Sequence, residues 1–144
     1  MGEAVIPEHV ALVPGANDLL RWFGYWPTFH DAEVIRVDIR RSGTSAVSVH
    51  TFEATDVVNG RGAYVCTKHV VVTFVMNGIR EATCTGFNHQ NVLSGLEIAV
   101  SEGAYELKLE GCYGVDATIT ADALRIDLAP GAPSDSQYLA AATL

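Results

Sequence analysis

The sequence predicts a mainly β (α+β) fold, in which an antiparallel meander of about eight strands curls into a barrel or a sandwich after one short N-terminal helix. From residue 33 onward, apolar and polar residues alternate with a period of two, which is typical of half-buried strands. Short turns rich in Gly, Asn and Asp separate these runs, and only one segment has helical spacing. With 49% hydrophobic and 18% charged residues, the 144-residue chain has the composition of a folded domain rather than a disordered one.

The helix is predicted directly before residue 24. Asn17 is expected to cap its first turn, and Gly24 to end it in a left-handed conformation. The apolar residues between them fall at helical spacing: Leu19, Leu20 and Phe23. A helix of roughly two turns is not stable alone, so its apolar side is expected to pack on the strands.

The alternating runs predict eight strands, at residues 35–39, 46–53, 64–76, 79–84, 96–100, 105–109, 117–119 and 124–128. The run 64–76 is apolar on both faces, which indicates a central strand. Asn77-Gly78 is a strong hairpin signal, and it predicts that Met76 pairs with Ile79. Ala121-Asp122 predicts a second tight turn, between the last two strands.

The composition also predicts how the chain is organised. Residues 1–130 are expected to form a single globular domain, and residues 131–144 a flexible C-terminal tail rich in Pro, Gly, Ser and Ala. The first residues lack the basic and apolar regions of a signal peptide, and no apolar run approaches the ~20 residues that span a bilayer. We therefore expect a soluble cytoplasmic protein that does not contact membranes.

The charges and cysteines exclude several classes of partner and cofactor. A net charge of −8 argues against nucleic-acid binding, which depends on Lys and Arg at phosphates, and favours a basic partner. Three widely spaced cysteines without a CxxC pair indicate reduced thiols that pack as small buried hydrophobes. Neither a cofactor nor a metal ion is expected.

The densest polar group in the sequence is His30-Asp31 with Glu33. One interpretation makes His30 a general base oriented by a carboxylate. A metal site would recruit further histidines, namely His50, His69 or His89. No spacing typical of either chemistry is present, so packing at a junction between loop and strand, or contact with a partner, are the alternatives.

A second polar group is the run of Asn88, His89, Gln90 and Asn91. Amide side chains bond readily to backbone groups in turns, so these residues are expected to tie down a loop. The alternative is a recognition loop that offers both donors and acceptors.

The run FGYWPTFHDAEV at residues 23–34 resembles the N-terminal signature of the immunity protein 50 family. Later segments resemble the family in the same order, at residues 50–53, 64–74 and 86–93 and at Tyr113-Gly114. This resemblance, which covers about residues 17–128, implies a bacterial protein that protects its producer from a polymorphic toxin. It implies no catalytic residues.

Two main hypotheses for function follow. The first is a non-enzymatic immunity protein that covers a cognate, basic toxin domain, with contacts expected from exposed carboxylates and the two polar groups: His30, Asp31, Glu33, Asn88, His89, Gln90, Asn91, Glu102, Glu106 and Glu110. The second is a small-molecule-binding β-barrel or hydrolase with His30, Asp31 and His89 in one pocket. A homodimer that pairs through an open sheet edge is a third.

Overall fold

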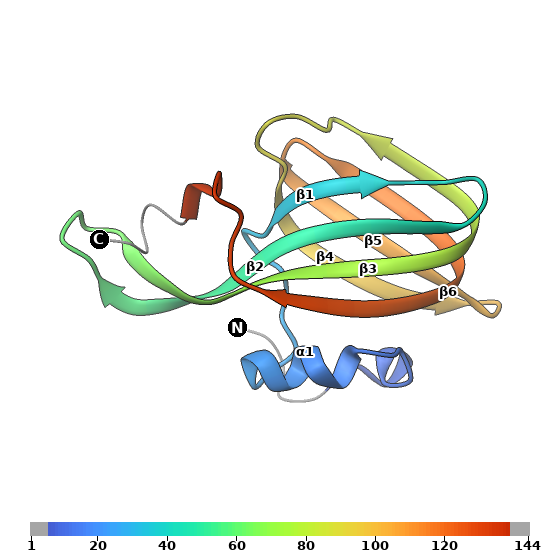
Figure 1. The fold of residues 1–144 in the computed structure, drawn as a ribbon, viewed down its shortest axis with the longest axis horizontal. Coiled ribbons are helices and arrows are strands. Elements are labelled where there is room, and N and C mark those ends of the chain that lie inside the picture. Colours follow the sequence, from blue (N-terminus) through green and yellow to red (C-terminus); the bar gives the residue numbers. More distant parts are fainter. Residues whose placement is uncertain (1–5, 139–144) are drawn as a thin grey trace.

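A computed structural model describes residues 6–138 (Figure 1). A short 3-10 helix, η1 (Glu8–Val10), and the helix α1 (Ala16–Phe23) precede six strands. The strands are β1 (Glu33–Asp38), β2 (Thr44–Val58), β3 (Tyr64–Thr85), β4 (Val92–Ser101), β5 (Ala104–Tyr113) and β6 (Asp116–Pro130). All paired strands are antiparallel and lie in one sheet, which confirms the mainly β class with one helix in the described part of the chain.

The strand pairings close into a ring in the order β1-β2-β3-β6-β5-β4. Strands β1 to β3 form one meander and β4 to β6 form another, and β3 pairs with β6 rather than with β4. The continuous meander predicted from the sequence is therefore interrupted after β3. The ring closes between β1 and β4 through one ladder pair, Glu33 opposite Val92.

The prediction of eight strands is wrong, because two of the predicted turns do not reverse the chain. β3 continues through Asn77-Gly78, and Met76 lies opposite Leu124 of β6 instead of Ile79. Likewise, β6 continues through Ala121-Asp122. Each long strand was thus predicted as two short ones, and six strands result.

The two dipeptides that the sequence predicts as turns, Asn77-Gly78 and Ala121-Asp122, lie opposite each other at a bend shared by β3 and β6. Gly78 has a φ of +71°, and the register between β3 and β6 shifts just after it. A Cβ atom on Gly78 would come within 2.4 Å of the Asp122 carboxylate, so the bend requires glycine there. Arg80 then pairs with Asp122 at 2.6 Å across the bend. Glycine and aspartate serve here as bulge residues between paired strands.

The predicted helix is confirmed, including its C-terminal cap at Gly24, where φ is +84°. Its N-cap is Gly15 and not Asn17, which lies inside the helix. A Cβ atom at Gly15 would lie 1.8 Å from the Ile126 carbonyl oxygen, so the close approach of β6 selects glycine at this position.

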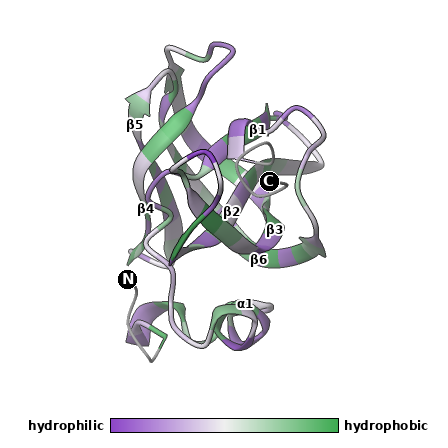
Figure 2. Cartoon of the chain, turned by 90° about the vertical axis from the view of Figure 1, so that its left-hand side faces the viewer, coloured by the Kyte–Doolittle hydropathy of each residue, from purple (hydrophilic) through white to green (hydrophobic). Residues whose placement is uncertain are grey.

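The helix lies beside the second half of β6, outside the ring of strands (Figures 1 and 2). Beyond Ala121, β6 no longer pairs with β5, and the Ile126 N–H donates instead to the Pro14 carbonyl at 2.8 Å. The apolar side of α1 is fully buried here, at Ala16, Leu19 and Phe23. The helix therefore extends the core, whose largest fully buried side chains include Phe29, Phe74, Met76, Leu93 and Leu107.

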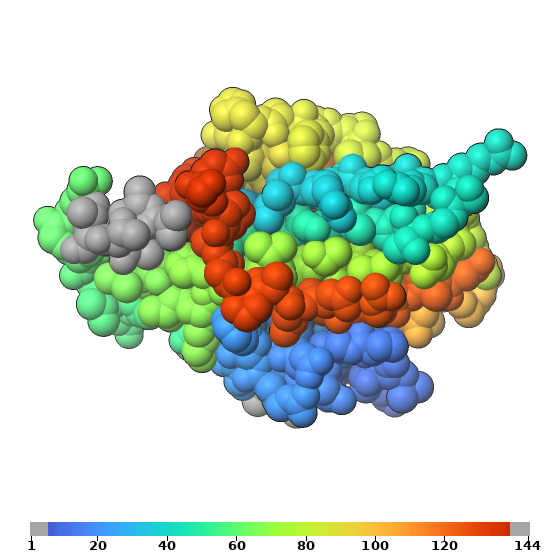
Figure 3. Space-filling model, viewed as in Figure 1, coloured from blue at the N-terminus to red at the C-terminus, as the bar shows by residue number. Residues whose placement is uncertain are grey.

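The hairpin of residues 51–69, formed by the ends of β2 and β3, projects beyond the ring (Figure 1, green). The last residues described return along it, and Figure 3 shows them (red) between this hairpin and β1. Ser136 is buried there. The expected flexible tail of residues 131–144 remains a prediction, and its residues 139–144 lie outside the described residues.

Two details complete the comparison with the sequence. Of the three cysteines, Cys66 is buried as expected, but Cys84 and Cys112 are exposed, because they lie near the ends of their strands. Within residues 6–138, no helix is long and apolar enough to cross a lipid bilayer.

Candidate functional site

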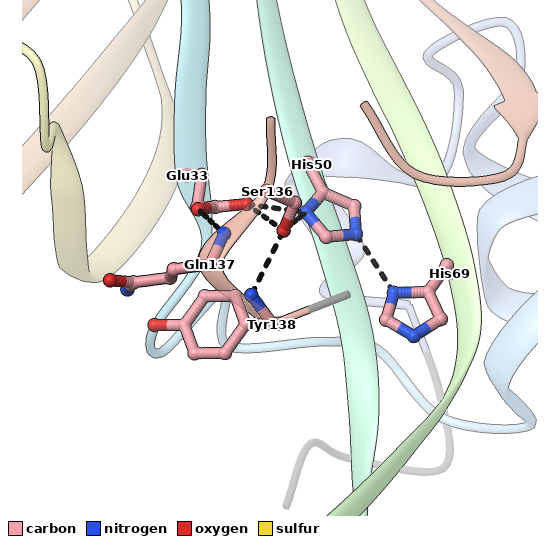
Figure 4. Close-up of polar contacts among 6 residues, drawn as sticks. All are labelled: Glu33, His50, His69, Ser136, Gln137 and Tyr138. Atoms are coloured by element: carbon pink, nitrogen blue, oxygen red, sulfur yellow. Dashed lines mark hydrogen bonds and ion pairs between the residues drawn. The ribbon is translucent and has the colours of Figure 1, made fainter. Parts of the chain in front are cut away.

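A line of hydrogen-bonded side chains crosses three neighbouring strands, from Glu33 on β1 through His50 on β2 to His69 on β3 (Figure 4). Glu33 and His50 are direct cross-strand partners, so their side chains share one face of the sheet. The Glu33 Oε1 atom lies 2.7 Å from His50 Nδ1, and His50 Nε2 lies 2.9 Å from His69 Nδ1. The His50 side chain has no exposed surface.

The hydrogen bond to Glu33 fixes one proton of this line. A carboxylate only accepts, so His50 carries a proton on Nδ1 and donates to Glu33. His50 Nε2 and His69 Nδ1 share the second hydrogen bond. The remaining nitrogen, His69 Nε2, is buried and has no hydrogen bond to any described residue. Burial, followed by the proximity of His50, lowers the pKa of His69, in agreement with a neutral ring.

Glu33 also holds the returning C-terminal segment. The Ser136 hydroxyl donates to Glu33 Oε1 at 2.6 Å, and the Gln137 N–H donates to Oε2 at 3.2 Å. Burial raises the pKa of Glu33, but the hydrogen bonds from His50, Ser136 and Gln137 outweigh it and hold the pKa below its ordinary value. Glu33 is thus an ionised anchor with three donors.

This arrangement differs from the triad of a serine hydrolase. In such a triad, the serine hydroxyl bonds the imidazole nitrogen opposite the one that faces the carboxylate. Here Ser136 donates to the carboxylate itself and lies 3.4 Å from the same nitrogen, His50 Nδ1. His69 occupies the other nitrogen. The geometry holds the C-terminal segment in place and leaves no activated hydroxyl. Nor do residues 6–138 contain three His, Cys, Asp or Glu side chains grouped to hold a metal ion.

His30 and Asp31 lie in the loop before β1, where Asp31 has a φ of +66°. Both side chains are exposed, and His30 Nε2 lies 3.6 Å from the Asp31 carboxylate. They line a pocket of about 240 Å³ together with residues of β2, including Phe52. His89 does not line this pocket. Glu33 does not line it either, and its carboxylate is instead bonded to His50. The three residues of the hydrolase hypothesis are therefore not brought together in it.

The loop of residues 88–91 is tied down by its own amides, as expected. Asn88 Oδ1 accepts from the backbone N–H groups of Gln90 and Asn91, at 2.8 and 3.1 Å. Asn91 Oδ1 accepts from the Asn88 N–H at 2.8 Å, and Asn91 is buried. His89 and Gln90 are exposed. The side chains of Asn88 and Asn91 thus fix the shape of the loop, and those of His89 and Gln90 are left exposed at its surface.

The three predicted carboxylates lie on the β4–β5 hairpin. Glu102 is exposed in its turn, with a φ of +52°. Glu106 and Glu110 lie on β5 at positions that point to the same side of the sheet. Glu110 forms an ion pair with Lys108 at 3.4 Å. It also borders a cleft of about 750 Å³ between β4 and the N-terminal segment, lined by Trp26, Leu96 and Ile98, which the sequence did not reveal.

Comparison with known proteins then places this chain. A family model described as Immunity protein 50 matches residues 15–129, from the N-cap of α1 to the end of β6. The chain belongs to the immunity protein 50 family. No curated protein and no solved structure matches it. The matched range contains Glu33, His50 and His69 but ends before Ser136.

Sequence reasoning missed the connection between these residues. The sequence offers His50 and His69 as further metal ligands and within segments that resemble the family, and it predicts Ser136 and Tyr138 in a flexible tail. In the structure, Tyr138 packs on Phe52 with ring centroids 4.4 Å apart. The signal in the sequence is the expected pairing of residues 35–39 with residues 46–53, because it brings Glu33, just before the first of these strands, near His50 on the second. Nothing local marks Ser136, since its partner Glu33 is 103 residues away.

Proposed function

We propose that this member of the immunity protein 50 family is a non-enzymatic cytosolic protein that neutralises a cognate toxin domain by binding and covering it. The family match over residues 15–129 carries this proposal. The net charge of −8 supports a basic toxin domain as the partner, because complementary charge speeds association.

The geometry of the histidines supports binding rather than catalysis. Both nitrogens of His50 are used within the protein. The exposed side chains of His30 and Asp31 are 3.6 Å apart, so they form no hydrogen bond with each other in this structure. These residues are better suited to holding the fold, and to contact at the surface, than to turnover.

Seven members of the predicted contact set remain the proposed contacts, of which Glu106 and Glu110 are half-buried and the others exposed: His30, Asp31, His89, Gln90, Glu102, Glu106 and Glu110. Glu33 and the two asparagines of the 88–91 loop have their polar atoms engaged inside the protein. We assign to these three residues the task of holding the surface in shape.

A titration separates a stoichiometric binder from an enzyme. If the adjacent gene encodes a large secreted protein with a variable C-terminal domain, that domain is the probe, added at fixed concentration to increasing amounts of this protein. We expect toxin activity to fall linearly and to reach zero at a fixed molar ratio. Loss of activity in a large excess of toxin would show turnover and overturn the proposal, as would full toxin activity at every ratio.

The His30→Ala variant is the matched control for the enzyme hypothesis. The His30 side chain is exposed, and within residues 6–138 its polar contacts are the Ser94 carbonyl and the Asp31 carboxylate, so the variant is expected to fold normally. A binder with His30 at its rim retains a stoichiometric end point with slightly weaker affinity. A hydrolase that depends on this imidazole loses activity altogether.

A further inference from the structure

The outward positions of four adjacent strand segments form a continuous face: residues 81–85 of β3, 116–120 of β6, 106–110 of β5 and 95–99 of β4. Cross-strand partners share one side of a sheet, and Glu81 lies opposite Thr120, which lies opposite Glu106. Between these positions, Leu107 and Ile119 point inward and are buried. The polar set must therefore face outward. We call it the acidic face.

The acidic face concentrates negative charge. Its outward positions hold five acidic residues and one basic residue, namely Glu81, Glu97, Glu106, Glu110, Asp116 and Lys108. Five negative charges and one positive give −4, half of the net −8 of the chain. Its one cation, Lys108, is already paired with Glu110.

Elsewhere on the protein, several charges are neutralised by neighbouring side chains. Five cations pair with nearby carboxylates: Arg21, Arg40, Lys68, Arg80 and Arg125. By contrast, Glu81, Glu97 and Glu106 form no ion pair with any residue from 6 to 138. The acidic face thus presents carboxylates without internal partners, arranged on rigid strands.

Two exposed aromatic side chains stand at one end of this face. Phe87 lies two residues after the end of β3 and is 52% exposed, and Tyr113 ends β5 and is 59% exposed. The segments that carry them touch, because a Cβ atom on Gly86 would lie 2.5 Å from the Gly114 carbonyl oxygen. Hydrogen bonds from backbone N–H groups to the Asn88 and Asn91 side chains fix the loop that directly follows Phe87. Preorganised aromatic residues beside a polar rim are the usual anchors of protein interfaces.

From these observations we infer that the acidic face, anchored by Phe87 and Tyr113, is the surface that docks on a basic protein domain. The inference rests on the proposed function and identifies that domain with the toxin. The carboxylates steer the encounter and fix its register, whereas burial of the two aromatic rings slows dissociation.

The charge is tested with Glu97→Lys/Glu106→Lys against a matched control, Glu8→Lys/Asp56→Lys. The control changes two exposed acids outside the face, which also lack ion pairs in the described chain. Binding to the adjacent-gene toxin domain is measured by stopped flow at low and high salt. We expect the face variant to lower the association rate at low salt about 10-fold, and the control less than about 2-fold. Should the lysines disturb folding, the isosteric Glu→Gln pair is expected to give a smaller loss in the same direction.

The anchors are tested with Phe87→Ala/Tyr113→Ala against Tyr64→Ala/Val58→Ala. The control residues lie on the projecting hairpin and are similarly exposed, at 61% and 53%. We expect the anchor variant to raise the dissociation rate about 30-fold, as for a loss of one strong hot spot, and the control to leave it within about 2-fold.

The outcomes separate this inference from the proposed function. If the wild-type protein binds the toxin domain and only the face and anchor variants bind weakly, the inference is supported. If the wild type binds and these variants match it, or the control variants fail instead, the inference is overturned while the proposed function stands. If the wild type itself neither binds nor protects, both are overturned.

Discussion

Replacement of Glu33 by glutamine removes the charge at the centre of the hydrogen-bonded line without changing the size of the side chain. The carboxylate accepts from His50 and Ser136 at one oxygen and from Gln137 at the other. A glutamine oriented to accept from His50 and Ser136 turns its NH2 group toward the Gln137 N–H. Glu33→Gln therefore weakens two hydrogen bonds and replaces the third by two opposed donors.

The size of the effect follows from these three contacts. A hydrogen bond to a charged acceptor contributes about 1 kcal/mol more than one to a neutral acceptor, which gives about 2 kcal/mol for the bonds from His50 and Ser136. Because Gln137 is exposed, its lost bond adds only about 0.5–1 kcal/mol. The Glu33 side chain is just 14% exposed, so water replaces little of this loss. We expect the free energy of unfolding to fall by about 3 kcal/mol at pH 7.

Urea unfolding followed by circular dichroism measures this change, with Glu97→Gln on the exposed outer side of β4 as the control. The pKa of Glu33 is lowered in the folded protein, so its stabilisation is complete above the ordinary value of 4.5 and disappears as the pH falls through the lowered value. The difference between wild type and Glu33→Gln should accordingly shrink below pH 4.5. A loss under about 0.5 kcal/mol at pH 7, equal to that of the control, would refute the assignment of Glu33 as an anchor.

Three further predictions follow from the described contacts. Gly15→Ala places a methyl group 1.8 Å from the Ile126 carbonyl oxygen and should lower the melting temperature far more than the control Gly24→Ala. The control methyl group meets nothing within 4 Å, so this variant should lose only about 1 kcal/mol of stability. Equal effects of the two variants would contradict the close approach of β6. The pKa of His69 is lowered on folding, so the wild-type protein should lose stability as the pH falls below 6.5, and His69→Asn should weaken that dependence in urea titrations at pH 7.5 and 5.5. Leu19→Ala removes a fully buried side chain of α1 and should cost about 2–5 kcal/mol in the same assay, whereas a cost under 1 kcal/mol would show that the helix does not stabilise the core.

The parts of the fold that the sequence predicted correctly depend on local spacing. The helix and its end at Gly24 follow from residues a few positions apart, and the alternation of the β5 residues Leu107 and Leu109 correctly marks the buried face. The errors occur where a local signal has a second meaning set by a distant strand. Asn77-Gly78 has the composition of a tight turn, but β6 lies alongside and pairs with both flanks, so the same residues form a bulge.

The candidate site was less predictable than the fold, because its contacts span long sequence distances. His30-Asp31 attracted attention as adjacent polar residues, yet both are exposed and only weakly engaged. The buried line depends on strand register between Glu33 and His50, and on a segment after β6 that reaches back with Ser136. Register can be proposed from a sequence, but the return of a Pro- and Ser-containing segment cannot.

The position of Glu33 explains why a polar line lies in this part of the fold. Glu33 is the residue of β1 that pairs with both β2 and β4, so it lies where the ring closes. That closure has one ladder pair and is completed by backbone bonds from the loops: Asp31 N–H to the Leu93 carbonyl, Leu93 N–H to Ala32 and Val34 N–H to Asn91, each 2.9 Å.

The two sides of this closure belong to residues 23–34 and 86–93, two of the segments that resemble the immunity protein 50 family. Their polar residues therefore serve first to join the first strand to the fourth, with Asn91 buried for that purpose and Glu33 linking the closure to the C-terminal segment. A surface for a partner must then be sought on side chains that the closure leaves free. Phe87 meets this condition within the second segment, and the unpaired carboxylates of β4 and β5 meet it beside that segment. The loop that buries Asn91 to close the ring therefore also places Phe87 at the edge of the acidic face. The dissociation rate of the Phe87→Ala/Tyr113→Ala variant tests whether Phe87 contacts the partner there.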